Sequence, residues 1–180
     1  MLSAVGMLLY TLVAALLAPV NGAMLRSPQH ASLCRLRGGA LPPVEHTFAM
    51  IKPDVAGDEL AVAAIKLLID AADLVIEREE ECQLSKEQCE TFYAEHKDRP
   101  FFPALVEFMS SGPVIKLELS GPGAVGEWRE LIGPTDSAKA REEASDSIRA
   151  LYGTDNQRNA AHGSDAVASA KRELALMFDS

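Results

Sequence analysis

Cysteine is scarce in this chain of 180 residues, and the three that occur, Cys34, Cys82 and Cys89, form no close-spaced pair. Zinc sites and dithiol redox centres depend on such pairs, so we predict neither and interpret the thiols as reduced and structural. Basic residues are also few. Residues 45–180 carry 14 Lys and Arg against 26 Asp and Glu, a net charge of −12. This balance argues against a nucleic-acid partner, and a polyphosphate ligand would need the few cations gathered at one place.

Acidic residues are absent from the first 44 residues, and no Lys or Arg precedes Arg26. Residues 4–18 form an apolar run that is short for a membrane span and has the length of a signal-peptide core, so we predict a signal peptide over 1–22. Residues 23–44 have the composition of a transit-like or disordered leader. Together they resemble the bipartite leader of plastid proteins in secondary endosymbiotic algae. We expect entry into the secretory pathway and transport to a plastid; secretion, or membrane association through an uncleaved anchor, is the alternative.

The remaining residues are enough for one domain with a sizeable core. Apolar runs predict strands at 47–51, 74–84 and 112–119. Helical spacing, caps and proline positions predict helices at 58–72, 85–96, 101–110, 123–131, 148–152 and 167–178, and the stretch 133–147 is predicted to be irregular. This order predicts an α+β fold, a ferredoxin-like four-stranded antiparallel sheet with helices packed on one face of it.

His162 stands among small residues in the segment 159–165, just before the last predicted helix. Imidazole, with an ordinary pKa of about 6.5, is largely neutral at cellular pH, so one ring nitrogen keeps a free lone pair. Glu173 on the inner side of that helix could reach back and fix the tautomer, which would make His162 a nucleophile. Taken alone, His162 is more simply interpreted as a core histidine bonded to the backbone.

Five motifs in order resemble the nucleoside diphosphate kinase family, from about Glu45 to Phe178. They are TFAMIKPD at 47–54, FYAEHKDRPFF at 92–102, SGPV at 111–114, SIRALYG at 147–153 and NAAHGSD at 159–165. The resemblance implies a kinase domain over 45–180 that transfers the terminal phosphoryl of ATP or another nucleoside triphosphate to a nucleoside diphosphate. It implies a phosphohistidine intermediate, a ping-pong scheme and Mg²⁺ held mainly by the nucleotide phosphates.

The resemblance also implies roles for individual residues. His162 would be the phosphorylated residue, Glu173 the partner of its second ring nitrogen, and Ser164 the support of Glu173. The residues implied to contact the nucleotide are Lys52, Tyr93, Arg129 and Arg149 near the transferring phosphoryl, Arg99 and Thr135 at the inner phosphates, Phe101 at the base and Asn159 at the ribose. Because stacking on Phe101 would accept any base, broad specificity is expected. Simpler interpretations are an apolar helix face for Tyr93 and a surface charge for Arg129.

Three departures from the common housekeeping members resemble the divergent group of this family. The sequence Val55–Leu60 replaces the usual glycine-bearing continuation, the chain between Arg129 and Arg149 is about three residues longer, and the C-terminal tail is short. We expect a homo-oligomer. The alternatives to a working kinase are a nucleotide-binding scaffold or regulatory domain with weak or no activity, and a membrane-tethered binding protein.

Overall fold

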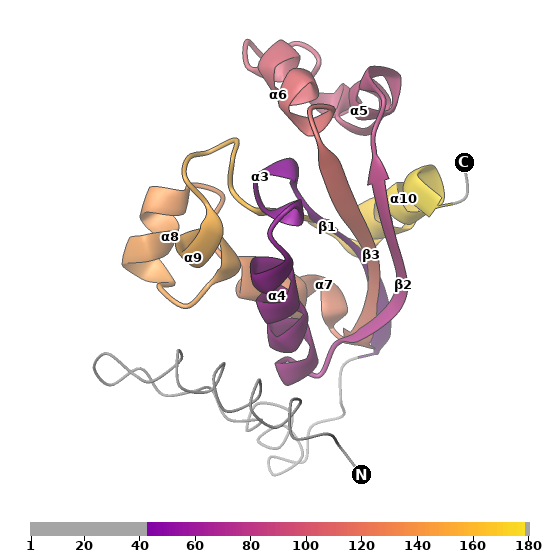
Figure 1. Cartoon of the computed structure of the whole chain (residues 1–180). Helices are drawn as coiled ribbons and strands as arrows, with labels where there is room; N and C mark the ends of the chain where they lie inside the picture. Colours follow the sequence, from indigo (N-terminus) through magenta and orange to yellow (C-terminus); the bar gives the residue numbers. More distant parts are fainter. Residues whose placement is uncertain (1–42, 179–180) are drawn as a thin grey trace, which may run out of the picture. The chain divides into compact units, whose positions relative to one another are not determined.

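The computed structural model describes residues 43–178 and shows an antiparallel sheet covered by helices (Figure 1). The elements are β1 (Val44–Ile51), α3 (Pro53–Ala56), α4 (Glu59–Ala71), β2 (Val75–Gln83), α5 (Lys86–Phe92), the 3₁₀ helix η1 (Ala94–His96), α6 (Phe102–Met109), β3 (Pro113–Pro122), α7 (Ala124–Ile132), α8 (Ser137–Glu143), α9 (Ile148–Tyr152), β4 (Ala161–Gly163) and α10 (Val167–Phe178). In this part of the chain no helix is long and apolar enough to cross a membrane.

The sheet has the strand order β2-β3-β1-β4, and each neighbouring pair is antiparallel. This order and the helical crossovers confirm the predicted α+β, ferredoxin-like fold. β1 lies in the middle, where Met50 is opposite Lys116 of β3 on one side and His162 of β4 on the other. The segment that contains His162 is therefore fixed to a central strand of the sheet.

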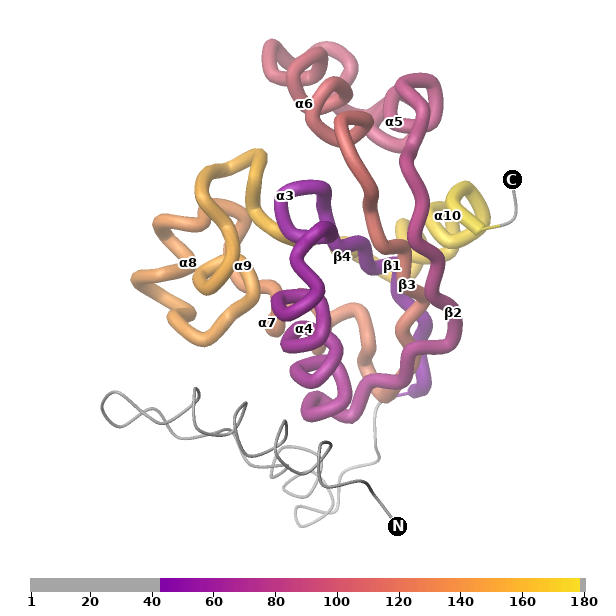
Figure 2. Tube along the Cα trace, viewed as in Figure 1, coloured from indigo at the N-terminus to yellow at the C-terminus, as the bar shows by residue number. Residues whose placement is uncertain are grey.

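Helices cover both faces of the sheet, so the prediction that they cover one face was wrong. Side chains alternate along β1 because successive residues of a strand point to opposite faces. Ala49 and Ile51 join a core with α4, α7 and α9, whereas Phe48 and Met50 join a second core with α5, α6 and α10. Figure 2 shows α4 and α7 on one side of the sheet and α10 on the other.

The remaining differences from the predicted elements have local causes. Helix α8 forms within the stretch predicted to be irregular, because the Asp136 carboxylate caps it by accepting the N–H groups of Ala138 and Lys139. Pro53 does not merely stop β1 but starts the short helix α3 at its first position. The predicted signal peptide (1–22) lies outside the described residues, as does the predicted leader (23–44) except for its last two residues.

Candidate active site

His162 lies on β4 with its ring among aromatic side chains. Its ring centroid is 5.1 Å from that of Phe92 and 5.9 Å from that of Phe48. The His162 side chain is 21% exposed, and burial holds the pKa of its imidazole below the ordinary value despite the opposing effect of Glu173. The imidazole is therefore neutral at physiological pH and reachable from one side.

Glu173 and Ser164 fix one ring nitrogen of His162. The Nε2 atom lies 2.9 Å from Oε2 of Glu173, and the Ser164 hydroxyl donates to the same oxygen at 2.8 Å. Both Glu173 and Ser164 are buried. Because an ionised carboxylate can only accept, Nε2 carries the hydrogen and Nδ1 keeps the lone pair. The structure thus brings together the three residues predicted as nucleophile, orienter and support.

Trp128 holds the backbone of this segment from α7, a contact that the sequence analysis did not find. Its indole N–H donates to the carbonyl oxygen of His162 at 3.0 Å, and Trp128 is fully buried. Gly163 packs directly against the indole: a Cβ atom there would lie 2.5 Å from Trp128 Cδ1. The only signal in the sequence is a single tryptophan in an apolar helix position.

Two buried cations, Lys52 and Arg149, act on His162 electrostatically. Burial, and then repulsion from Arg149, lowers the pKa of Lys52 to about 8. Burial, and then repulsion from Arg129, lowers the pKa of Arg149 to about 10. Arg149 donates to the carbonyl oxygens of Gly133 and Ala161. Within residues 43–178, neither Lys52 nor Arg149 makes an ion pair with a carboxylate, and such unpaired buried cations are suited to binding an anion.

The side-chain amide of Asn159 is hydrogen-bonded to other groups of the protein. Its Oδ1 accepts from the Lys52 ammonium at 2.6 Å, and its Nδ2 donates to the carbonyl oxygens of Thr135 and Asn156. Asn159 is only 1% exposed. A contact with a ribose, as the sequence analysis expects, would therefore require Asn159 to exchange one of these hydrogen bonds.

The backbone between Asn159 and His162 is strained at Ala160 and held by hydrogen bonds. Ala160 has a φ of +67°, which is uncommon for a residue with a side chain. Its N–H donates to Asp54 and its carbonyl oxygen accepts from the Lys52 N–H. Burial raises the pKa of the Asp54 carboxyl. Strain of this kind persists only where the surroundings hold it, and it is concentrated at functional sites.

Tyr93 ends α5 with a buried ring, 6.4 Å from the ring of His162 and edge-on to it. Burial raises the pKa of its phenol far above the ordinary value, so the hydroxyl stays protonated. Among the described residues that hydroxyl has no hydrogen-bond partner. The simpler interpretation, an apolar helix face, accounts for the ring but leaves the buried hydroxyl unexplained.

The other predicted site residues are exposed. Phe101 is 49% exposed at the start of α6, and its ring centroid is 5.7 Å from that of His96, which stacks on Tyr93. Arg99 lies in the turn between η1 and α6, and Thr135 in the loop after α7. Arg129, on α7, acts on Arg149 and on Asp165. Thr135 meets the buried set through its carbonyl oxygen, which accepts from Asn159, and Arg129 acts on it through the charge of Arg149.

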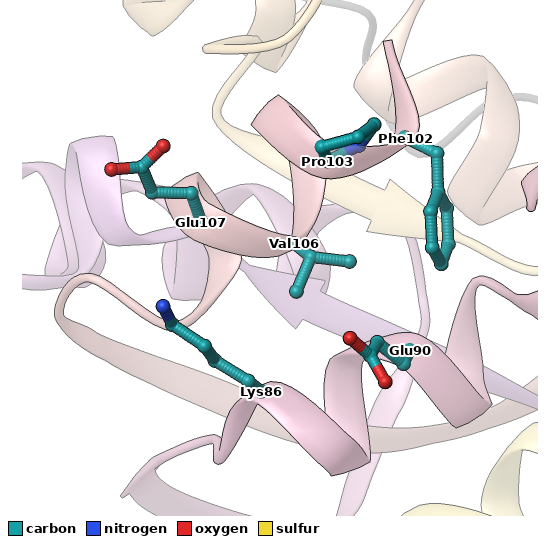
Figure 3. A pocket seen from close by; sticks show the side chains of 6 residues that line it. All are labelled: Lys86, Glu90, Phe102, Pro103, Val106 and Glu107. Atoms are coloured by element: carbon teal, nitrogen blue, oxygen red, sulfur yellow. The ribbon is translucent and has the colours of Figure 1, made fainter. Parts of the chain in front are cut away.

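A pocket lies apart from these residues, between α5 and α6 (Figure 3). It has a volume of about 360 Å³ and is lined by Lys86, Glu90, Phe102, Pro103, Val106 and Glu107. None of the predicted site residues lines it. Across residues 43–178 there is also no group of three or more His, Cys, Asp or Glu side chains that could hold a metal ion.

A tautomerically fixed histidine beside two buried cations defines a class of site, one that can receive an anionic group on a ring nitrogen. The family model described as nucleoside diphosphate kinase matches residues 45–180. The chain therefore belongs to the nucleoside diphosphate kinase family. Family and fold together support nucleotide binding and a transferase function of that kind.

Individual relatives agree with this assignment. The chain is 47% identical over 130 residues to a probable nucleoside diphosphate kinase 5 of Arabidopsis thaliana, covering 72% of this chain and 89% of that protein. It is 43% identical over 143 residues to nucleoside diphosphate kinase homolog 5 of Homo sapiens, covering 77% of this chain and 66% of the human protein's length. A nucleoside diphosphate kinase of Halobacterium salinarum, solved in complex with CDP, aligns with a TM-score of 0.71 at 36% identity, covering 77% of this chain and 90% of that one.

Proposed function

We propose that this chain transfers the terminal phosphoryl group of a nucleoside triphosphate to a nucleoside diphosphate through a phosphohistidine on His162. The observation that carries the proposal is the 2.9 Å contact between His162 Nε2 and Glu173 Oε2. It leaves the Nδ1 lone pair as the nucleophile. Lys52, Arg149 and the Tyr93 hydroxyl lie in the same region and are suited to binding phosphate oxygens.

In the first half-reaction the Nδ1 lone pair forms a bond to the terminal phosphorus. The bond from that phosphorus to the bridging oxygen breaks, and its electron pair leaves on the nucleoside diphosphate. In the second half-reaction a terminal oxygen of a new diphosphate attacks the phosphohistidine, and the N–P electron pair returns to Nδ1. The proton stays on Nε2, hydrogen-bonded to Glu173, throughout, so no proton has to leave the ring.

The donor set around His162 fits phosphate better than a bare metal ion. Its charged groups are the cations Lys52 and Arg149 and the carboxylate Glu173, whose Oε2 is already bonded to Ser164 and His162. We propose that Mg²⁺ enters on the nucleotide and supplies charge neutralisation on the phosphate oxygens. Binding and orientation of the phosphates then fall to Lys52, Arg149 and the exposed Arg99, Arg129 and Thr135.

A nucleotide-binding scaffold is the second candidate. The hydrogen bond of 2.6 Å between Lys52 and Asn159 favours it, because two residues proposed to contact the nucleotide are bonded to each other. Steady-state kinetics distinguish the candidates. A phosphotransferase that passes through a phosphoenzyme gives parallel double-reciprocal lines when GTP is varied at several fixed concentrations of ADP. A scaffold binds both nucleotides without turnover.

Glu173→Gln tests the orienting role. A glutamine oxygen still accepts from Nε2, but a charged hydrogen bond worth about 1.5–3 kcal/mol is replaced by a neutral one worth about 0.5–1.5 kcal/mol. We therefore expect kcat to fall about tenfold with the protein still folded. An unchanged kcat would remove Glu173 from the mechanism.

A further inference from the structure

The carboxylate of Glu173 has two differently partnered oxygens. Oε2 faces His162 and Ser164, whereas Oε1 lies 3.5 Å from a guanidinium nitrogen of Arg172. The Glu173 side chain is 7% exposed, and a buried carboxylate needs a compensating charge. His162 does not provide that charge, because burial keeps its imidazole neutral. Within residues 43–178, Arg172 is the only Lys or Arg in an ion pair with Glu173.

Arg172 is itself held from a second element. The same guanidinium nitrogen lies 3.8 Å from Oε2 of Glu95 on η1, two residues after Tyr93. The two carboxylates thus hold the guanidinium between α10, which carries Glu173, and the segment that follows α5. A hydrogen bond from Ser169 lowers the pKa of Asp165, which lies just before α10, and the charge of Arg172 acts in the same direction.

We propose that Arg172 is a positioning residue that acts through Glu173. Its guanidinium compensates the carboxylate charge, so that Glu173 accepts the hydrogen bond of a neutral His162 and does not draw a second proton onto the ring. This inference rests on the proposed function for its catalytic meaning, but its effect on the imidazole is independent of turnover.

The charges that face His162 decide the direction of the effect. Lys52 and Arg149 oppose protonation of the ring, Glu173 favours it, and Tyr93 on α5 stays neutral. Arg172 and Glu95 form the next layer, on the far side of Glu173. Removing the positive charge of Arg172 leaves the negative charge of Glu173 without compensation, so the His162 ring gains affinity for a proton. The imidazole pKa should rise, and less of the nucleophile should be available near neutral pH.

The test is an NMR titration of the His162 ring in the full chain without nucleotide, with the His162 signals assigned from their loss in His162→Gln. We expect Arg172→Gln to raise the imidazole pKa by about half a pH unit or more and Arg172→Lys to restore it. Lys171→Gln is the matched control, because it removes the same charge from the adjacent exposed residue of α10. It should leave the pKa unchanged.

Kinetics give the second readout. The acid limb of the pH profile of kcat/KM should move to higher pH in Arg172→Gln and not in Lys171→Gln. Equal imidazole pKa values in Arg172→Gln and Lys171→Gln would overturn the proposal, since Arg172 would then be one more surface charge. A shifted pKa in a protein that transfers no phosphoryl would instead support the positioning effect and contradict the proposed function. Arg172 is 57% exposed, so the substitution is expected to leave the fold intact.

Discussion

Lys52 is the residue whose ionisation responds most directly to a ligand. Its ammonium group is buried and hydrogen-bonded to neutral oxygens of Asn159 and Gln157, and its pKa is about 8. An arriving phosphate would place an opposite charge in direct contact with it, and an opposite charge raises the pKa of a lysine. Nucleotide binding should therefore be coupled to proton uptake.

We predict uptake of roughly half a proton per nucleotide at pH 8, because Lys52 is half neutral there and becomes charged in the complex. The affinity for nucleotide should fall as the pH rises from 7 to 9, because Lys52 is increasingly neutral in the free protein and has to be protonated for binding. Calorimetry in buffers with different ionisation enthalpies measures the uptake. Lys52→Met should abolish it, and binding without proton uptake at pH 8 would show that Lys52 does not meet the phosphates.

For the individual site residues, the sequence indicated which residues belong to the site better than it indicated which residues they contact. The pattern around His162 predicted the approach of Glu173, and the two side chains are in contact because α10 follows the histidine closely. The contact of Ser164 with Glu173 was implied only by the family resemblance. The contacts of Trp128 with His162 and of Asp54 with Ala160 join residues 34 and 106 positions apart. No local pattern encodes such pairs. The hydrogen bonds of Asn159 with Lys52 and Thr135 could not be predicted for the same reason.

Among the elements, β4 and α7 are packed with no spare volume. A methyl group on Gly163 would lie 2.5 Å from the Trp128 indole, closer than van der Waals contact permits. We predict that Gly163→Ala lowers the free energy of unfolding by about 1–3 kcal/mol, since overpacking forces side chains and backbone to shift.

The shift should also displace the carbonyl of His162 from Trp128 and so reduce turnover. Denaturant unfolding followed by tryptophan fluorescence measures the first effect, because Trp128 is the only tryptophan of the chain. Gly57→Ala is the control: a Cβ there meets nothing within 4 Å, and its stability should change little. Equal stability of the two variants would show that the β4–α7 contact is not tight.

The C-terminal end of α10 is anchored by a buried lysine in the sheet. Lys116 of β3 donates to the carbonyl oxygen of Met177 at 2.7 Å and pairs with Glu80 at 3.0 Å. The ring of Phe178 lies under both Lys116 and Arg78. This contact fixes the helix that carries Glu173.

We predict that Lys116→Met destabilises the protein by about 1–3 kcal/mol, because it leaves the Met177 carbonyl unpaired in a buried position. Lys66→Met is the matched control. It breaks a similar pair with Glu79, whose side chain is 40% exposed against 35% for that of Lys66, and should cost about 0.2–1 kcal/mol. Urea titrations compare the two, and a cost for Lys116→Met no greater than the control would mean that α10 is held by its apolar face alone.

Periodicity was most successful for the long elements. Helix α4 and strand β3 have strong apolar patterns, and both lie where the sequence predicted them. The sequence missed α8, which has only two buried positions, Ser137 and Ala140, and therefore no apolar stripe to recognise. The second covered face of the sheet was missed because alternation along β1 is invisible when both faces are apolar.

At the scale of the whole molecule, an acidic domain gathers some of its few cations around one histidine. Residues 45–180 carry a net charge of −12, yet Lys52 and Arg149 are buried and, among the residues that the structure describes, neither forms an ion pair with a carboxylate. Such an arrangement is costly for folding alone and is explained by a ligand that brings negative charge. The homo-oligomer, the signal peptide and the plastid or secretory destination stay predictions.

The central claim is that His162 carries the phosphoryl group. The most direct measurement is to incubate the protein with ATP labelled at the terminal phosphate and Mg²⁺ and then treat the labelled protein with acid or base. We predict label that is lost in acid, kept in base, absent from His162→Ala and removed by GDP, with nucleotide binding by His162→Ala largely intact. Bound ATP without transferred label would contradict the account and favour a nucleotide-binding scaffold.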